Sequence, residues 1–403
     1  MKRHFILLLS VFTSAALQAQ NFISEGPWRG VFHQPNGTEV PFNFEVKGKN
    51  IATAKLYLIN GTEHFPASRL VQKGDSVYVA FDQFDNELAL KVTGKELSGV
   101  LRKNDHSGRT LEVSAKWGET FRFADDGKKP AADITGKYDV TFRSPKGGED
   151  TKKVGLFRQQ GSKLYATFLS ITGDSRYLEG IVQGDRFYLS SFIGGGPAYY
   201  AGTINKDELT GTAGGATFTA NKNPDAVLPD PYKLTYLKEG YQSFNFSLPD
   251  ADGNKVTLQD DKFKNKVVIV TIGGTWCPNC MDEAAFMAPW YKKNKDRGVE
   301  VVGVQFERKS DPAYVKNAME NFKNRFNVSY TELYGGLADK KAVAESFPAL
   351  NTFLSFPTIL FIDKNGKVDK IYTGFTGPAT GDYYTQFIKE FNAEVDKLLL
   401  EKA

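Results

Sequence analysis

A nearly continuous apolar run that ends just before two cysteines is the feature that most restricts the fold. Residues 266–272 read Lys-Val-Val-Ile-Val-Thr-Ile, which is typical of a strand buried on both faces of a parallel sheet. A Gly-Gly-Thr turn follows, then Trp276-Cys277-Pro278-Asn279-Cys280, then a mostly helical segment to about Lys293. Beyond it we expect strands at 299–304, 358–362 and 367–372 and helices at 312–326 and 383–399. This alternation predicts an α/β domain, which we place at residues 240–403.

Cys277 and Cys280 are the only cysteines in 403 residues. Random placement would bring them this close about once in two hundred, so the spacing indicates a paired function. A cysteine at the first turn of a helix faces unpaired N–H groups and the positive end of the helix dipole, which favour a thiolate. Pro278 suits the first helical position. Cys280, one turn later, can attack a mixed disulfide formed at Cys277.

Two structural roles for the cysteine pair are alternatives. A disulfide over so short a loop restricts the unfolded chain very little, so it would stabilise the fold only weakly. A metal site needs further ligands, and the sequence offers no third cysteine and no histidine nearby. We therefore expect redox chemistry with no metal and no cofactor.

With these residues in view, the segment from about Gly240 to Ala403 resembles the TlpA/ResA-like envelope thiol-disulfide oxidoreductases of the thioredoxin superfamily. The resemblance implies a thioredoxin-like fold, in which Cys277 is the exposed nucleophile and Cys280 resolves the mixed disulfide. The sequence Ser-Phe-Pro-Thr at 355–358 matches a loop whose proline is cis and whose backbone pairs with the substrate. The residues expected to contact substrate are therefore Trp276, Pro278, Phe356 and Pro357.

Glu283 lies three residues after Cys280, on the same side of the helix. The matching acid in ResA-like proteins is thought to handle protons for the cysteine pair, and burial would raise its pKa for that purpose. A solvated helix glutamate is the alternative. Three positions depart from the family pattern: Thr271 replaces a buried Asp, Gly273 replaces an aromatic residue, which could open the surface beside the site, and the nearest helix proline is Pro289, about a turn later than usual.

The N-terminal half has a different pattern, in which short alternating segments are separated by Gly, Asn and Asp turns. Such alternation predicts antiparallel strands joined by tight turns. Similar stretches recur about 110 residues apart, starting at Gly26 and Gly136, at Gly74 and Gly184, and at Glu96 and Glu208. We therefore predict a multidomain chain: duplicated all-β units at 20–125 and 134–223, a proline-rich linker at 224–239, and the C-terminal thioredoxin-like domain. Chance similarity between hairpins is the alternative to duplication.

Residues 1–19 have the basic start, apolar core and small-residue end of a secretory signal peptide, with cleavage expected after Ala19. An uncleaved anchor is the alternative, although the apolar core is shorter than the roughly 20 residues that a membrane span needs. We expect an exported, soluble, periplasmic protein. A formal net charge of only +4, without a basic block, gives no electrostatic reason to expect nucleic acid as a partner.

The sequence thus predicts an exported enzyme that reduces disulfides of envelope proteins and draws electrons from a membrane thiol-disulfide carrier. One alternative is a thiol peroxidase, since peroxiredoxins share the fold; they generally place a Thr three residues before the reactive Cys, where this chain has Gly274. The other is a binding module, in which the β-rich half captures an unknown ligand and the redox site is secondary.

Overall fold

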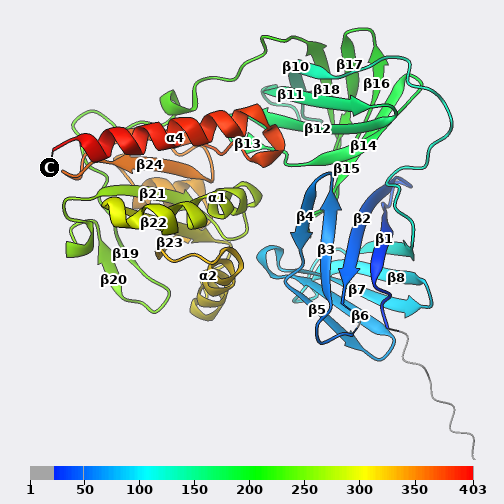
Figure 1. Cartoon of the computed structure of the whole chain (residues 1–403), viewed down its shortest axis with the longest axis horizontal. Coiled ribbons are helices and arrows are strands. Elements are labelled where there is room, and N and C mark those ends of the chain that lie inside the picture. Colours follow the sequence, from blue (N-terminus) through cyan, green and yellow to red (C-terminus); the bar gives the residue numbers. More distant parts are fainter. Residues whose placement is uncertain (1–21, 49, 403) are drawn as a thin grey trace, which may run out of the picture.

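The computed structural model describes residues 22–48 and 50–402. The predicted signal peptide lies outside the described residues. The chain forms two all-β units followed by a thioredoxin-like α/β domain, and Figure 1 shows the α/β domain on one side of the molecule and both β units on the other. In the described part of the chain, no helix is both long and apolar enough to cross a membrane.

The first β unit is an antiparallel sheet with the strand order β4-β3-β2-β1-β9-β8-β7-β6-β5. Alternating residues of its strands are buried, and Trp28, Phe32 and Phe44 are among the largest side chains of its core. The strands are β1 (Gly26–His33), β2 (Glu39–Lys47), β3 (Lys55–Asn60), β4 (Glu63–Pro66), β5 (Arg69–Lys73), β6 (Ser76–Phe81), β7 (Asn86–Thr93), β8 (Glu96–Lys103) and β9 (Leu111–Trp117).

The second β unit is a barrel. Its strands follow the order β11-β10-β18-β17-β16-β15-β14-β12, and β12 pairs again with β11, so the sheet closes on itself. The short β13 flanks β12. The strands are β10 (Gly136–Arg143), β11 (Thr151–Gln160), β12 (Lys163–Ser170), β13 (Gly173–Asp174), β14 (Leu178–Gln183), β15 (Arg186–Ser191), β16 (Ala198–Asn205), β17 (Glu208–Ala213) and β18 (Ala216–Lys222).

Equivalent strands of the two units follow each other in the same order. β1 and β10 begin at Gly26 and Gly136, and each pairs with the next strand and with the last strand of its unit. β8 and β17 likewise begin at Glu96 and Glu208. The all-β half is therefore built from two units of matching strand order, at the spacing that the sequence repeats predicted.

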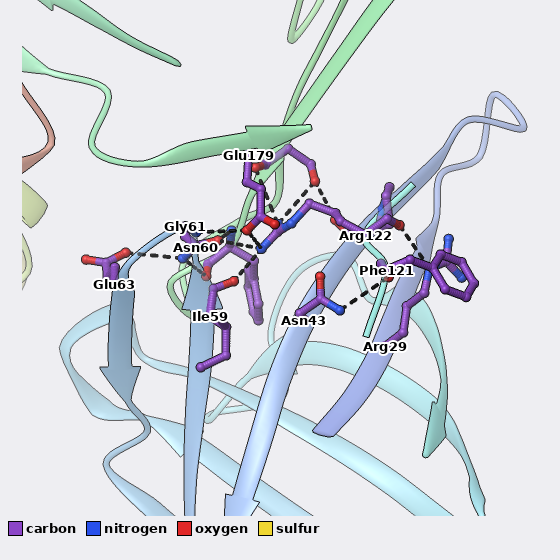
Figure 2. A network of polar contacts seen from close by, with 12 residues as sticks. Arg29, Asn43, Ile59, Asn60, Gly61, Glu63, Phe121, Arg122 and Glu179 are labelled. Carbon is purple, nitrogen blue, oxygen red and sulfur yellow. Dashed lines mark hydrogen bonds and ion pairs between the residues drawn. The ribbon is translucent and has the colours of Figure 1, made fainter. Parts of the chain in front are cut away.

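A buried arginine joins the two β units, as Figure 2 shows. Arg122 is 4% exposed, donates to the carbonyl of Ile59 in the first unit and lies 3.5 Å from a carboxylate oxygen of Glu179 in the second. The same carboxylate accepts a hydrogen bond from the Gly61 amide at 2.8 Å. Asn60 exchanges hydrogen bonds with the backbone of Phe192 at 3.0 and 3.2 Å. A buried charge needs such partners, so this junction depends on both units.

The thioredoxin-like domain holds a sheet of order β23-β22-β21-β24-β25. β21 (Val267–Gly273), β22 (Val299–Glu307) and β23 (Thr331–Leu337) are parallel, whereas β24 (Thr358–Ile362) and β25 (Val368–Thr373) run antiparallel to their neighbours. Every residue of β21 is buried, as the apolar run predicted. The helices are α1 (Pro278–Asn294), α2 (Pro312–Phe326), α3 (Lys340–Ser346) and α4 (Asp382–Leu400).

Residues 231–238 lie against the thioredoxin-like domain. The Thr235 hydroxyl, which is buried, accepts a hydrogen bond at 2.8 Å from the Thr373 hydroxyl at the end of β25. The Lys238 amide donates to the Ala349 carbonyl at 2.8 Å, and Leu237 forms a β-bridge with Leu350. This part of the proline-rich segment therefore packs as an extension of the α/β domain.

Candidate functional site

The turn between β21 and α1 is held by the end of the neighbouring strand β22. Glu307, fully buried there, accepts hydrogen bonds from the Thr275 amide at 3.1 Å and from its hydroxyl at 2.9 Å. The Trp276 indole N–H donates to the Phe306 carbonyl at 2.9 Å. Burial raises the pKa of Glu307 to about 7, against the hydrogen bonds from Thr275, which lower it. These contacts fix the chain immediately before Cys277.

Cys277 is the N-cap residue of α1, and Pro278 occupies the first turn. Its Sγ atom accepts a hydrogen bond from the Cys280 amide at 3.4 Å and lies 3.5 Å from the Phe356 carbonyl oxygen. Both cysteines are present as free thiols. The helix begins where the sequence places the cysteine pair, so Cys277 faces the N–H groups of the first turn.

The two thiols have opposite pKa shifts. Burial opposes ionisation of Cys277, but hydrogen bonds from the Cys280 thiol and from the amides of Cys280 and Asn279, with the charge of Arg176, lower its pKa overall. Burial raises the pKa of Cys280 well above the ordinary value, and the neighbouring Cys277 and Glu283 add to the effect. The geometry thus favours a thiolate on Cys277 and a protonated thiol on Cys280.

The proline loop lies beside Cys277. The Phe356–Pro357 peptide bond is cis, as the resemblance implied. The ring of Phe356 meets that of Trp276 edge-on, with centroids 5.7 Å apart. The structure therefore brings together Trp276, Pro278, Phe356 and Pro357, the four residues expected to contact substrate, around the cysteine pair.

Cys277 is not exposed, contrary to what the resemblance implied. Only 6% of its surface is accessible, because a loop of the second β unit lies over the motif. We call residues 171–176, between β12 and β14, the covering loop. The Ser355 hydroxyl donates to the Thr172 carbonyl at 2.8 Å, and Arg176 donates to the Pro278 carbonyl at 2.8 Å.

Glu283 is buried on the inner side of α1, 4% exposed, so the solvated alternative is wrong. Its Oε1 atom has no hydrogen-bond partner among the described residues. Burial raises the pKa of Glu283 well above the ordinary value, and the charges of Cys277 and Glu332 raise it further. A carboxyl with a raised pKa beside a thiol pair can give a proton in its protonated form and accept one in its ionised form.

Two polar residues that the sequence did not single out lie behind Cys280. The Gln305 side chain donates to Glu332 at 2.8 Å, and burial raises the pKa of Glu332 to about 8. Gly273 is buried and opens no surface: a Cβ there would lie 3.4 Å from Cys280 Sγ and 3.5 Å from Gln305 Oε1. The available signal was the polar pair Gln305 and Glu307 at the end of an otherwise apolar strand.

Comparison with known proteins assigns the α/β domain. A model of the AhpC/TSA family matches residues 240–371. The thiol-disulfide oxidoreductase ResA of Bacillus subtilis (strain 168) is 31% identical over 153 residues, which cover 38% of this chain and 77% of that protein. The chain belongs to the ResA family of thiol-disulfide oxidoreductases.

A second relative and one solved structure were also matched to this chain. ResA of Bacillus thuringiensis subsp. konkukian (strain 97-27) is 32% identical over 134 residues, or 33% of this chain and 68% of that protein. Among solved structures, the thioredoxin domain of a thiol-disulfide oxidoreductase from Bacteroides vulgatus is 23% identical, covers 39% of this chain and 99% of that chain, and has a TM-score of 0.29. Both β units lie outside the residues that the AhpC/TSA model matches.

The protein is thus an enzyme of thiol-disulfide chemistry. Its family relationship concerns the α/β domain, which carries the cysteine pair, Glu283 and the proline loop. Within the described ranges, no group of three or more His, Cys, Asp or Glu residues is arranged to hold a metal ion. The covering loop comes from the part of the chain that this relationship leaves unexplained.

Proposed function

We propose that this enzyme reduces disulfides of proteins outside the cytoplasm through Cys277 and Cys280. The Cys277 thiolate attacks one sulfur of a substrate disulfide, which forms a mixed disulfide and releases one substrate thiolate. The Cys280 thiolate then attacks Cys277 Sγ, which releases the second substrate thiol and leaves a Cys277–Cys280 disulfide. Two electrons pass to the substrate, so a dithiol donor must reduce the enzyme again.

The position of Cys277 Sγ carries this proposal. It caps the N-terminus of α1 and accepts a hydrogen bond from the Cys280 amide at 3.4 Å. It also lies 3.5 Å from the carbonyl oxygen of Phe356 in the cis-proline loop. The N-terminus of the helix favours the thiolate form of a sulfur at this point, and the sulfur can contact a substrate chain that is aligned along the proline loop. Cys280, one turn inward and 2% exposed, has access to Cys277 but little access to solvent.

Glu283 serves the second step in this proposal. Cys280 must lose its proton before it can attack, and Glu283, in its ionised form, is the buried group on the same helix that can accept this proton through its unpaired oxygen. The signal-like N-terminus supports an envelope location, where a membrane thiol-disulfide carrier would supply electrons. Substrates are then disulfide-containing envelope proteins.

Serine variants of the two cysteines test the order of attack. With insulin as the disulfide substrate and dithiothreitol as the electron source, Cys277→Ser should abolish reduction. Cys280→Ser should accumulate a mixed disulfide through Cys277, which denaturing electrophoresis and mass spectrometry can identify. Trapping through position 280 in the Cys277→Ser protein, with none in Cys280→Ser, would reverse the assignment.

A thiol peroxidase is the second candidate, because the matching family model describes AhpC/TSA proteins. The turn argues against it. A Cβ at position 274 would lie 2.6 Å from the Trp276 indole nitrogen and 2.7 Å from the Phe306 carbonyl, so the threonine typical of peroxiredoxins has no room there. Consumption of hydrogen peroxide at a rate above that of insulin reduction would favour the peroxidase.

A further inference from the structure

The covering loop lies across the surface where the proposed function requires a substrate. It comprises the turn of the hairpin formed by β12 and β13, β13 itself and the two residues that follow; in this hairpin Ser170 pairs with Gly173 and Leu169 with Asp174. Figure 1 shows β13 reaching from the barrel to the N-terminal end of α4 in the thioredoxin-like domain. A segment more than 100 residues before the cysteines therefore lies directly on them.

The loop contacts the cysteine motif through backbone hydrogen bonds. With the side-chain amide of Asn279, between the two cysteines, assigned the orientation that satisfies both of its polar atoms, it donates to the Asp174 carbonyl at 3.2 Å and accepts from the Asp174 amide at 2.8 Å. On the other side of Cys277, Ser355 beside the cis-proline donates to the Thr172 carbonyl at 2.8 Å. The redox surface thus recognises an extended backbone through donors and an acceptor on both sides of the nucleophile.

Two glycines make this close approach possible. Gly173 has φ +130°, and a Cβ there would lie 1.7 Å from the Asn279 amide group. Across the contact, Gly374 has φ +79°, and a Cβ there would lie 3.0 Å from the Ile171 carbonyl oxygen. A Cβ at position 173 would displace the Asn279 side chain from its contacts with the loop backbone, and a Cβ at position 374 would press on the loop backbone itself.

Charged groups hold the base of the loop. Arg176 is buried and forms ion pairs with Glu63 of the first β unit and with Asp282 of α1. The Asp174 carboxylate accepts a hydrogen bond from the Gly377 amide at 2.7 Å. The Glu63 carboxylate also accepts a hydrogen bond from the Asn60 side-chain amide at 3.2 Å, within the junction of the β units in Figure 2. The loop is thus anchored to all three parts of the chain.

We infer that the covering loop occupies the substrate-binding surface of the resting enzyme, and that the β-rich half thereby gates the redox site. Extended polypeptide substrates must displace residues 171–176 to reach Cys277, and chains with small residues next to their cysteine fit the space that Gly173 fills. The inference rests on the proposed function, because it assigns the substrate class and the regulation of the same site. The observed rate then depends on the fraction of molecules with the loop displaced.

Alkylation of Cys277 by iodoacetamide in the reduced full-length chain tests the gate. Gly173→Ala should increase the rate about tenfold, since it strains the backbone at φ +130° and displaces Asn279, and so lowers the population of the docked state that hides the sulfur. Gly161→Ala is the matched control: it lies in the β11–β12 turn of the same barrel, has φ +62°, and a Cβ there meets nothing within 4 Å. It also places an alanine at positive φ, with a smaller backbone penalty than at Gly173, and should alkylate at the wild-type rate.

A second variant in the loop distinguishes displacement of the loop from misfolding of the Gly173→Ala protein. Asp174→Ala removes the hydrogen bonds that the carboxylate accepts from the Gly377 and Arg176 amides, and it should give a smaller increase of the same sign. Equal alkylation rates in the wild type and both loop variants, all folded by circular dichroism, would overturn the gate. Insulin reduction separates the two claims: inactivity of every protein refutes the proposed function, whereas activity with no difference between the proteins refutes only the gate.

Discussion

Arg176 of the second β unit forms an ion pair with Asp282 of the helix that carries the cysteine pair. Both side chains are largely buried, and Arg176 also pairs with Glu63 of the first β unit. Burial raises the pKa of Asp282 to about 7, against the charge of Arg176, which lowers it. One guanidinium thus compensates acidic groups from two other parts of the chain, immediately beside the redox site.

Replacement of Arg176 by Gln should destabilise the closed arrangement. Removal of one partner from a buried ion pair leaves the remaining charges uncompensated, which costs about 3 kcal/mol of unfolding free energy. The pKa of Cys277 should also rise, because Arg176 helps to lower it. Urea unfolding and the ultraviolet absorbance of the thiolate as a function of pH measure the two effects.

Arg158→Gln is the control for that change. Arg158 is an exposed arginine of the same barrel, placed over the Tyr165 ring at 4.6 Å, and its loss should leave both quantities nearly unchanged. Wild-type stability together with a wild-type thiol titration in Arg176→Gln would show that the buried ion pairs contribute nothing to the site.

Glu283→Gln should slow the second half of the exchange reaction. With Ellman's reagent, Cys277 releases the first thionitrobenzoate and Cys280 the second, so the two steps appear as separate phases. Loss of the proton acceptor should slow the second phase about 100-fold and change its pH profile, while the first phase changes little. Glu283→Asp keeps a carboxyl group and should recover part of the rate. An unchanged second phase in Glu283→Gln would remove Glu283 from the mechanism.

Glu332 should make the protein less stable as the pH rises. Its pKa is raised in the folded state to about 8, so the folded chain holds a proton that the unfolded chain has already lost. The associated stability is present at low pH and is lost as the pH rises toward 8. Glu332→Gln should flatten this dependence between pH 5 and 8, as followed by urea unfolding, and Glu320→Gln on the exposed side of α2 should not. A parallel pH dependence in wild type and Glu332→Gln would contradict the assignment.

Glu307→Ala should disturb the turn before Cys277. The change leaves the buried amide and hydroxyl of Thr275 without their acceptor, which costs about 1–3 kcal/mol. Glu307→Gln keeps an acceptor oxygen and should lose less stability. Thermal unfolding measures the ranking, and the account fails here if the Ala variant is as stable as the Gln variant.

The part of the site formed by residues close to Cys277 in the sequence could be predicted almost completely. A buried strand, a tight turn and a helix that begins at Pro278 follow from residues within about 30 positions of Cys277, and these elements lie where the pattern predicted them. The spacing of Glu283 placed it on the same side of the helix as Cys280, whereas its burial is shown only by the structure. β23 was missed, because two glycines interrupt its short alternating pattern.

The contacts made by residues far from Cys277 in the sequence could not be predicted. Arg176 contacts Pro278 across 102 residues of sequence, and nothing in its neighbourhood marks it as a partner of the cysteines. The same holds for Thr172, whose contribution is a backbone carbonyl and not a side chain. Burial of Cys277 depends on how the β unit docks, so the sequence led to an exposed cysteine where the structure has a covered one.

The reduction potential of the Cys277–Cys280 pair in the purified full-length protein tests the central claim most directly. It can be measured by equilibration with glutathione or dithiothreitol buffers, followed by alkylation of the free thiols. A value near that of thioredoxin, about −270 mV, is the result expected of a disulfide reductase. A value near that of the strong oxidants, about −120 mV, would contradict the account, because such a pair would donate its disulfide to substrates instead of reducing theirs.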